Sequence, residues 1–275
     1  MTLPFLDDIS GTIRGYRIFT ACRTVNGKIF RLEDHLERLY QSAASIYMKP
    51  PMEAVELAAL LSDLTAANLN KYPGVDLLLD IVFSGGLLGS TMQQSGNGAH
   101  LYVAVQELVP PPPEAYSNGV ALATFPHQRP WADVKLLNYV GAILAHQTVV
   151  PANDAWDALF VDPADGRTLL EGSTFTVFFV DARGEVVTPP LDGRILHSIT
   201  RRVTFEILLG QEWPVLRESP VTIDMLPSFA EAFLCSTTRN ILPLNRIDRH
   251  VIGNGSPGPV TKHIMKLFDE YIRSY

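Results

Sequence analysis

The sequence predicts an α+β protein with two domains. Apolar strand-like runs and helix-like patterns are mixed along the chain, without the strict alternation of strand and helix that a doubly wound sheet requires. Of the 275 residues, 47% are apolar and 19% are charged, which is enough apolar sequence for a large core. Pro126 and Pro130 interrupt the pattern, so we place a linker at residues 125–133, between a small domain (1–124) and a larger one (134–275).

The first domain is predicted to begin with a hairpin and two helices. Residues 13–30 hold two β-rich runs around Asn26-Gly27, a dipeptide that accepts positive φ in a tight turn. Residues 32–46 place Leu36 and Leu39 on one face of a helix. A second helix is expected at 52–69, and strands at 75–83, 101–108 and 119–125.

The second domain is predicted to mix short strands with three helices. The elements expected are an alanine-rich helix at 137–150, strands at 158–161, 174–180, 186–188, 231–236 and 241–247, a helix at 198–209, and a last helix from Pro257-Gly-Pro259 to near Tyr275. Ser198 and Thr200 both have side chains suited to cap the middle helix.

Composition and charge exclude several classes of function. A net charge of −7 argues against a protein that binds nucleic acid or an anionic membrane surface. No apolar run reaches the roughly 20 residues of a membrane span, and the first residues lack the pattern of a signal peptide, so we expect a cytoplasmic protein. Cys22 and Cys235 lie far apart in apolar runs and are expected to be buried thiols. No Cys/His spacing indicates a metal site.

Lys135 lies between valine and leucine in a strand-like run, where a solvated surface lysine is a poor fit. Apolar neighbours favour the neutral amine, which can attack an aldehyde and form a Schiff base. A lysine at a strand end whose charged tip reaches water is the alternative.

Glu171 follows Leu169-Leu170 and precedes Gly172 and a core strand, which is an unusual place for a solvated carboxylate. A carboxylate opposite a pyridine nitrogen keeps that ring protonated. A glutamate in a hairpin that faces solvent is the alternative.

Candidate anion-binding groups lie in three other runs. Arg38, in His35-Leu-Glu-Arg-Leu39, has a guanidinium suited to phosphate, although an exposed arginine paired with Asp34 is the better explanation of this run taken alone. The helix start at Ser198-Ile-Thr-Arg201 offers backbone N–H groups, and Ser236-Thr-Thr238 offers hydroxyls.

Taken in order, these runs resemble the class IV pyridoxal-phosphate aminotransferases. That family includes branched-chain and D-amino acid aminotransferases, (R)-selective amine aminotransferases and aminodeoxychorismate lyases. The resemblance extends from Gly15 to about Phe268, with a weaker match at Gly258-Pro-Val-Thr261. Its five main motifs are Phe30-Arg-Leu-Glu-Asp-His-Leu-Glu-Arg-Leu39, Val134-Lys-Leu-Leu-Asn-Tyr139, Leu170-Glu-Gly-Ser-Thr174, Ile195-Leu-His-Ser-Ile-Thr-Arg201 and Glu231-Ala-Phe-Leu-Cys-Ser-Thr-Thr238.

The resemblance implies pyridoxal 5′-phosphate as cofactor and a role for each matching residue. Lys135 would form the Schiff base and shuttle the proton, and Glu171 would pair with the pyridine nitrogen. The other implied cofactor contacts are Tyr139 with the phenolic oxygen, Arg38, Ile199, Thr200 and Thr237 with the phosphate, and Thr238 towards the substrate. The implied fold is type IV: a small α/β domain, a larger α+β domain with a barrel-like sheet, the cofactor in the cleft between them, and a homodimer.

Three departures from the family concern the substrate side. Phe19-Thr20 stands where Phe-Glu is usual, Ser84-Gly85 lacks the Arg-Gly turn of D-amino acid enzymes, and Phe175-Thr176 replaces Ser-Asn. The resemblance implies that the substrate meets Phe19 and Thr238. The candidates to bind a substrate carboxylate are Arg17, Arg23 and Arg129.

The function expected from the resemblance is transamination between an amino acid, or a primary amine, and a 2-oxo acid. One alternative is a lyase that uses the same cofactor and releases pyruvate from an aminodeoxychorismate-like substrate. A protein that binds the cofactor without turnover is the other alternative.

Overall fold

The computed structural model describes residues 7–89, 92–95 and 98–275. The described chain divides into two compact units. The first holds the chain up to Val109, together with Asp133–Asn138 and Tyr275. The second holds Pro110–Ala132 and Tyr139–Ser274. Both units combine helices with a largely antiparallel sheet, which confirms the predicted α+β class.

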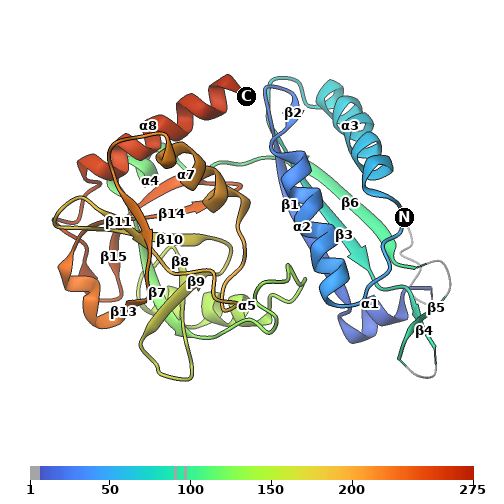
Figure 1. Cartoon of the computed structure of the whole chain (residues 1–275), viewed down its shortest axis with the longest axis horizontal. Coiled ribbons are helices and arrows are strands. Elements are labelled where there is room, and N and C mark those ends of the chain that lie inside the picture. Colours follow the sequence, from blue (N-terminus) through green and yellow to red (C-terminus); the bar gives the residue numbers. More distant parts are fainter. Residues whose placement is uncertain (1–6, 90–91, 96–97) are drawn as a thin grey trace. The chain divides into compact units, whose positions relative to one another are not determined.

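The first unit is a four-stranded antiparallel sheet with two helices packed on one face (Figure 1). The strands, in order across the sheet, are β2 (Lys28–Ile29), β1 (Arg17–Val25), β3 (Leu77–Ser84) and β6 (His100–Glu107). The helices are α2 (Leu32–Ser45) and α3 (Ala54–Lys71). Helix α1 (Ile9–Arg14) and the ribbon of β4 (Leu87–Leu88) and β5 (Gln94–Ser95) also belong to this unit.

Alternation along β3 builds the core of the first unit. Leu77, Leu79, Ile81 and Phe83 are each 0% exposed and share one apolar cluster with α2 and α3. Since successive side chains of a strand point to opposite faces, these four residues all face the helices.

The hairpin predicted around Asn26-Gly27 is present. Asn26 has φ 50° and Gly27 has φ 79°, and Val25 pairs with Lys28 across the turn. Positive φ at both central residues matches the twist of the two strands. The predicted start at Ile13 is wrong, because Ile13 lies in α1 and the strand begins at Arg17.

The second unit is built on a ten-stranded sheet that curls around an apolar interior (Figure 1). Its strands run in the order β12 (Leu216–Glu218), β11 (Val186–Thr188), β10 (Thr176–Asp181), β14 (Phe229–Ser236), β15 (Asn240–Ile247), β7 (Val120–Pro126), β8 (Asp157–Val161), β9 (Thr168–Gly172) and β13 (Val221–Thr222), with β16 (His250–Val251) paired to β15. The helical segments are α4 (Pro113–Asn118), α5 (Val140–Gln147), α6 (Val149–Ala152), α7 (Ile199–Leu209), η1 (Ile223–Ser228) and α8 (Pro259–Ser274).

Some predicted elements of the second unit differ from those observed. The single helix expected at 137–150 is two helices, α5 and α6, which meet at Thr148, where φ is −121° and ψ is −82°. Strand β9 was not predicted, and it contains Glu171. Pairing with β8 and β13 places this run in the sheet, and such long-range pairing is not visible in local sequence.

Helix α8 begins where the Gly258-Pro-Val-Thr261 motif meets a buried carboxylate. Glu231 of β14 accepts hydrogen bonds from the N–H groups of Val260 (3.1 Å) and Thr261 (2.7 Å). A Cβ on Gly258 would lie 2.1 Å from Cδ of Glu231. Glycine is therefore required for the carboxylate to approach the helix N-terminus.

The two compact units do not coincide with the predicted segments 1–124, 125–133 and 134–275. Strand β7 groups with the second unit because it pairs with β15 and β8. Asp133–Asn138 groups with the first unit because this segment bonds to β1.

Asp8 ties the start of the described chain to the end of β3. Its carboxylate, 1% exposed, accepts hydrogen bonds from Ser84 Oγ (2.6 Å), Arg17 Nη2 (2.9 Å) and the Gly86 N–H (3.0 Å). Burial by itself raises the pKa of Asp8, but the hydrogen bonds from Ser84, Arg17 and Gly86 outweigh it and hold the pKa below the usual 3.8. The carboxylate therefore stabilises the first unit as long as it is charged.

We expect Asp8→Asn to lower the free energy of unfolding at pH 7 by about 1–3 kcal/mol, because it leaves buried donors without an acceptor of full charge. A carboxyl with a lowered pKa in the folded state stabilises above its unfolded pKa of about 3.9 and loses this effect as pH falls through the folded value. Urea unfolding at pH 7 and pH 3 measures the difference.

The matched control is Asp7→Asn, since Asp7 is exposed; its effect should stay within about 0.5 kcal/mol. A cost of Asp8→Asn that is equal at both pH values would contradict the role of the charge.

Candidate functional site

The segment around Lys135 lies along β1 of the first unit. The Phe19 N–H donates to the Lys135 carbonyl (3.0 Å), and the Leu137 N–H donates to the Arg17 carbonyl (3.0 Å). The predicted strand is thus a single bridge between Ile18 and Leu136, at the edge of the sheet. Lys135 is half-buried, and its Nζ lies 4.6 Å from the centroid of the Phe19 ring. Both bonds hold the lysine in register with β1, so the amine lies over an aromatic face.

A buried polar group lies on the same strand, opposite helix α2. Arg38 Nη2 donates to Thr20 Oγ1 (3.0 Å), and Thr20 Oγ1 lies 2.8 Å from His35 Nδ1. Arg38 is 9% exposed, His35 1% and Thr20 0%. Arg38 is therefore a buried guanidinium, and the predicted alternative of an exposed arginine is wrong.

His35 stays neutral in this group. Burial lowers the pKa of His35 well below its usual 6.5, and the positive charges of Arg38, Lys135 and Arg31 lower it further. Since Arg38 donates to the Thr20 hydroxyl, the hydroxyl proton is available to His35 Nδ1. The first unit thus places Lys135 and Arg38 near a neutral histidine, and a local excess of positive charge favours an anionic ligand.

Glu171 is held inside the second unit by two groups from outside β9. Its side chain is buried, and Arg129 Nε donates to its Oε1 (3.0 Å), with Arg129 Nη2 in contact with the same oxygen. The Leu196 N–H donates to Oε2 (3.1 Å). The predicted alternative of a solvent-facing glutamate is therefore wrong.

Gly172 explains part of the motif that follows. A Cβ on Gly172 would lie 2.0 Å from the ring of Phe175, so the ring packs directly against the backbone beside Glu171. Phe175, where relatives are expected to have serine, is a core residue at 4% exposed.

Helix α7 presents its N-terminus at the end of the loop that contains Leu196. Ser198 caps the helix by accepting from the Arg201 N–H (3.3 Å). Ile199 and Thr200 form the first turn and are 6% and 5% exposed. The N–H groups of a first helical turn have no partner within the helix, so this turn can bind an anion.

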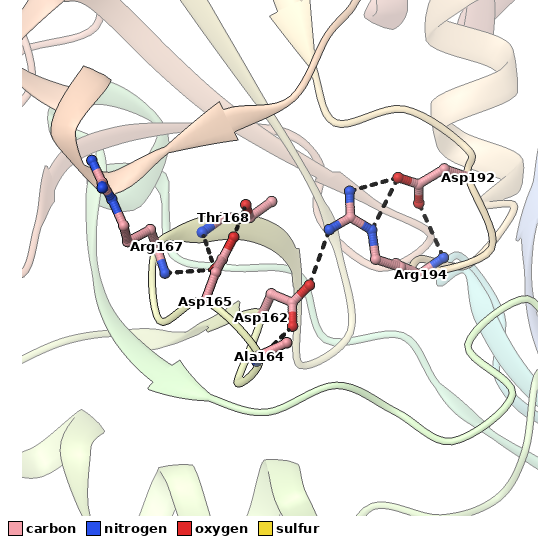
Figure 2. A network of polar contacts seen from close by, with 7 residues as sticks. All are labelled: Asp162, Ala164, Asp165, Arg167, Thr168, Asp192 and Arg194. Atoms are coloured by element: carbon pink, nitrogen blue, oxygen red, sulfur yellow. Dashed lines mark hydrogen bonds and ion pairs between the residues drawn. The ribbon is translucent and has the colours of Figure 1, made fainter.

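The loop before α7 is fixed by a network of carboxylates and one arginine (Figure 2). Arg194 donates to Asp192 Oδ2 through Nε (3.0 Å) and to Asp162 Oδ2 through Nη1 (3.0 Å). The hydrogen bonds to Asp192 and Asp162 raise the pKa of Arg194 despite its partial burial. Because Asp162 directly follows β8, this bridge holds the loop against the sheet.

The same figure shows the turn between β8 and β9. Asp165 accepts from Thr168 Oγ1 (2.6 Å), the Thr168 N–H (2.9 Å) and the Arg167 N–H (2.8 Å). These hydrogen bonds, those from Thr168 first, lower the pKa of Asp165 to about 2. The turn sets the start of the strand that contains Glu171.

Thr237 and Thr238 lie in the turn between β14 and β15. The next residue, Arg239, is held by Asp157 (Nη2 to Oδ2, 2.9 Å) and lies over the ring of Phe175 (5.7 Å). Ser236 Oγ is buried and has no hydrogen-bond partner among the residues that the structure describes. A buried hydroxyl of this kind, beside two further hydroxyls, suits the oxygen atoms of a phosphate.

The remaining predicted residues lie as follows. Tyr139 is half-buried at the N-terminus of α5. Arg17 donates to Ser84 and Asp8, and Arg23 lies over the Phe30 ring (5.8 Å). Arg129 contacts Glu171. All three arginines thus contact groups of the chain itself, and binding of a substrate carboxylate by any of them stays a prediction.

Sequence reasoning missed the contacts between these residues. Arg129 and Glu171 were each singled out, but their pairing depends on a sheet that brings β7 and β9 to either side of β8. The sequence did indicate that His35 and Arg38 lie close together, since residues three apart share one helical face. It did not indicate that both contact Thr20.

Two absences apply to the described part of the chain. There, no three side chains of His, Cys, Asp or Glu gather where they could hold a metal ion. Within residues 7–89, 92–95 and 98–275, no helix is both long enough and apolar enough to cross a membrane.

Comparisons with known proteins agree with the resemblance predicted from the motifs. A family model described as amino-transferase class IV matches residues 17–247. The D-alanine aminotransferase of Bacillus licheniformis is 30% identical over 270 residues, which cover 95% of this chain and 90% of that protein.

Two solved structures show the same fold. The T.th. branched-chain amino acid aminotransferase with pyridoxamine 5′-phosphate has a TM-score of 0.84 at 24% identity, covering 99% of this chain and 90% of the other. A hypothetical aminotransferase from Mycobacterium tuberculosis in its PLP-bound form has a TM-score of 0.83 at 21% identity, covering 100% and 94%. They confirm the predicted type IV fold.

We expect His35 to remain neutral through pH 6.5, because charging it would place a further cation among Arg38, Lys135 and Arg31. Nitrogen-detected NMR of the imidazole, assigned with the variant His35→Asn, follows the ring between pH 5.5 and 8 (about one unit to either side of an ordinary histidine pKa). A titration midpoint near 6.5 would show that the buried group carries no such positive field.

Proposed function

We infer that this chain, which belongs to the amino-transferase class IV family, is an aminotransferase that uses pyridoxal 5′-phosphate to move an amino group from an amino acid or primary amine to a 2-oxo acid. The observation that carries the proposal is the match over residues 17–247, a range that contains Lys135 and Glu171. The cofactor supplies an electron sink that stabilises negative charge at the substrate Cα.

We assign Lys135 to covalent attachment and proton transfer. Its register on β1 and its place over the Phe19 ring support this role. A lysine amine held against an apolar face reacts with a carbonyl group more readily than a solvated ammonium. With the cofactor and a substrate bound, Nζ would be the base that takes the proton from the substrate Cα and returns it.

The phosphate is assigned to Arg38, to the N–H groups of Ile199, Thr200 and Thr237, and to the hydroxyls near Ser236. The buried guanidinium of Arg38 and the first turn of α7 support the assignment. Glu171 is assigned to the pyridine nitrogen because it is a buried carboxylate, and Tyr139 to the phenolic oxygen by its motif position. Phe19 and Thr238 are proposed to face the substrate.

A second candidate function is a pyruvate-releasing lyase with the same cofactor, and a third is cofactor binding without turnover. The third is favoured by the departures at Thr20 and Ser84, where groups that face the substrate are expected. Ser84 is engaged by Asp8 and Arg17, and Thr20 by His35 and Arg38. A lyase releases pyruvate without a second substrate, whereas a binding protein responds to no donor in a panel of both enantiomers of leucine, glutamate and alanine.

We further propose that the protein is a cytoplasmic homodimer. Cys22 and Cys235 are free buried thiols, which suits a reducing compartment. On α5, Val140, Ile143 and Leu144 are 63%, 57% and 51% exposed and lie on one side of the helix. A stripe of exposed apolar side chains is typical of a protein interface.

Lys135→Ala should abolish transamination and the covalent adduct, because no other amine is held over Phe19 in the described chain. After borohydride reduction of the protein with pyridoxal 5′-phosphate, mass spectrometry should find the adduct on Lys135. The matched control is Lys266→Ala, an exposed lysine on α8 that should leave rate and adduct unchanged. Activity retained by Lys135→Ala would eliminate the mechanism.

Ile143→Glu should shift the protein from dimer to monomer, since a charge in an apolar interface is not compensated. Sedimentation velocity over a range of concentrations measures the shift. Val55→Glu is the control, because Val55 is 76% exposed on α3 and lies outside the α5 stripe. A variant dimer as tight as the wild type would place the interface elsewhere.

A further inference from the structure

We propose that Arg129 is a positioning residue for Glu171, and that Oε2 of Glu171 is the oxygen that meets the pyridine nitrogen. The inference rests on the proposed function. It assigns to Arg129 a role different from the substrate-binding one that its sequence suggests.

The contacts divide the two oxygen atoms of Glu171 between different partners. Oε1 receives both Nε and Nη2 of Arg129, and Oε2 receives the Leu196 N–H at 3.1 Å. A carboxylate oxygen has two lone pairs. The arginine therefore uses both acceptor positions of Oε1. On Oε2, one position remains beside the Leu196 bond, and no other described residue donates to it.

Burial makes this pairing necessary. The side chains of Arg129 and Glu171 are 15% and 8% exposed. A carboxylate withdrawn from water needs a positive partner or several hydrogen bonds, and the removal of one partner leaves an uncompensated charge. The planar guanidinium also directs two N–H groups at Oε1 in a fixed geometry, which an ammonium does not do.

Both partners of Glu171 are themselves anchored. Arg129 Nη2 also donates to the carbonyl of Ala132 (3.3 Å), which fixes the arginine to the chain just before the Lys135 segment. Leu196 follows the loop that Arg194 binds to Asp162 and Asp192 (Figure 2). Glu171 is thus held before any ligand binds, and such preorganisation reduces the cost of binding.

The contacts also oppose a substrate role for Arg129. A guanidinium that binds a substrate carboxylate bidentately presents two N–H groups in one plane. Here Nε and Nη2, which form one such edge, are directed at Glu171 and Ala132. Loss of Arg129 should therefore weaken cofactor binding rather than change the KM of one substrate.

The test compares Arg129→Gln, Glu171→Gln and the double variant. Pyridoxal 5′-phosphate is titrated into cofactor-free protein, tryptophan fluorescence reports the Kd, and absorbance of the loaded protein is recorded across pH. Each single variant should raise the Kd by about tenfold or more and alter the pH dependence of the absorbance in the same direction. The double variant should be no worse than Glu171→Gln, since both changes remove one interaction.

Arg183→Gln is the matched control, because Arg183 pairs with Asp181 and Glu185 at 72% exposed and should leave the Kd unchanged. If Arg129→Gln does not fold, Arg129→Lys is measured in its place. Lysine keeps the positive charge but lacks the two N–H groups that the guanidinium directs at Oε1. Its Kd for pyridoxal 5′-phosphate should therefore lie between those of the wild type and Glu171→Gln.

Two outcomes would overturn the inference. In the first, Arg129→Gln (or Arg129→Lys, if the glutamine variant does not fold) has the Kd and the absorbance spectrum of the wild type but a raised KM for the 2-oxo acid. Arg129 would then be a residue that binds the substrate. The other outcome is additive effects in the double variant. A wild-type protein that does not bind the cofactor would instead refute the proposed function itself.

Discussion

The curled sheet of the second unit encloses a carboxylate, and a buried carboxylate must be compensated. Glu171 lies on β9, which pairs with β8 and β13, and its charge is met by Arg129 and the Leu196 N–H. The order of these strands decides which residues can reach it. Arg129 follows β7 and Leu196 precedes α7, so one carboxylate joins segments distant in sequence. The neighbouring turns and loop are held by Asp165 and Arg194.

In the first unit, the buried charge is positive and belongs to Arg38. Arg38 on α2 reaches Thr20 on β1, and Thr20 in turn contacts His35. His35 avoids adding to the positive charge because its pKa is lowered by burial and by the nearby cations. Family members are expected to have a glutamate at position 20, which would neutralise this charge. A hydroxyl there retains the hydrogen bonds while leaving the positive field for an anion.

Local patterns were sufficient for most helices and strands. Alternation in β3, the Asn26-Gly27 turn and the cap at Ser198 each rest on neighbours in sequence, and the structure has all three. Elements that depend on distant pairing were missed or displaced, such as β9, and Lys135 lies in a bridge rather than a strand. The break at Thr148 also escaped prediction.

The sequence by itself determined the family, the fold class and the two residues, Lys135 and Glu171, on which the expected chemistry rests, because motif order and residue type are local properties. Only the tertiary structure decided what those residues touch. In the structure, Arg129 pairs with Glu171, Arg17 pairs with Asp8, and Arg38 donates a hydrogen bond to Thr20. The physical reason is that a charge removed from water takes whichever partner the packed strands bring within reach, and strand order cannot be derived from spacing along the chain.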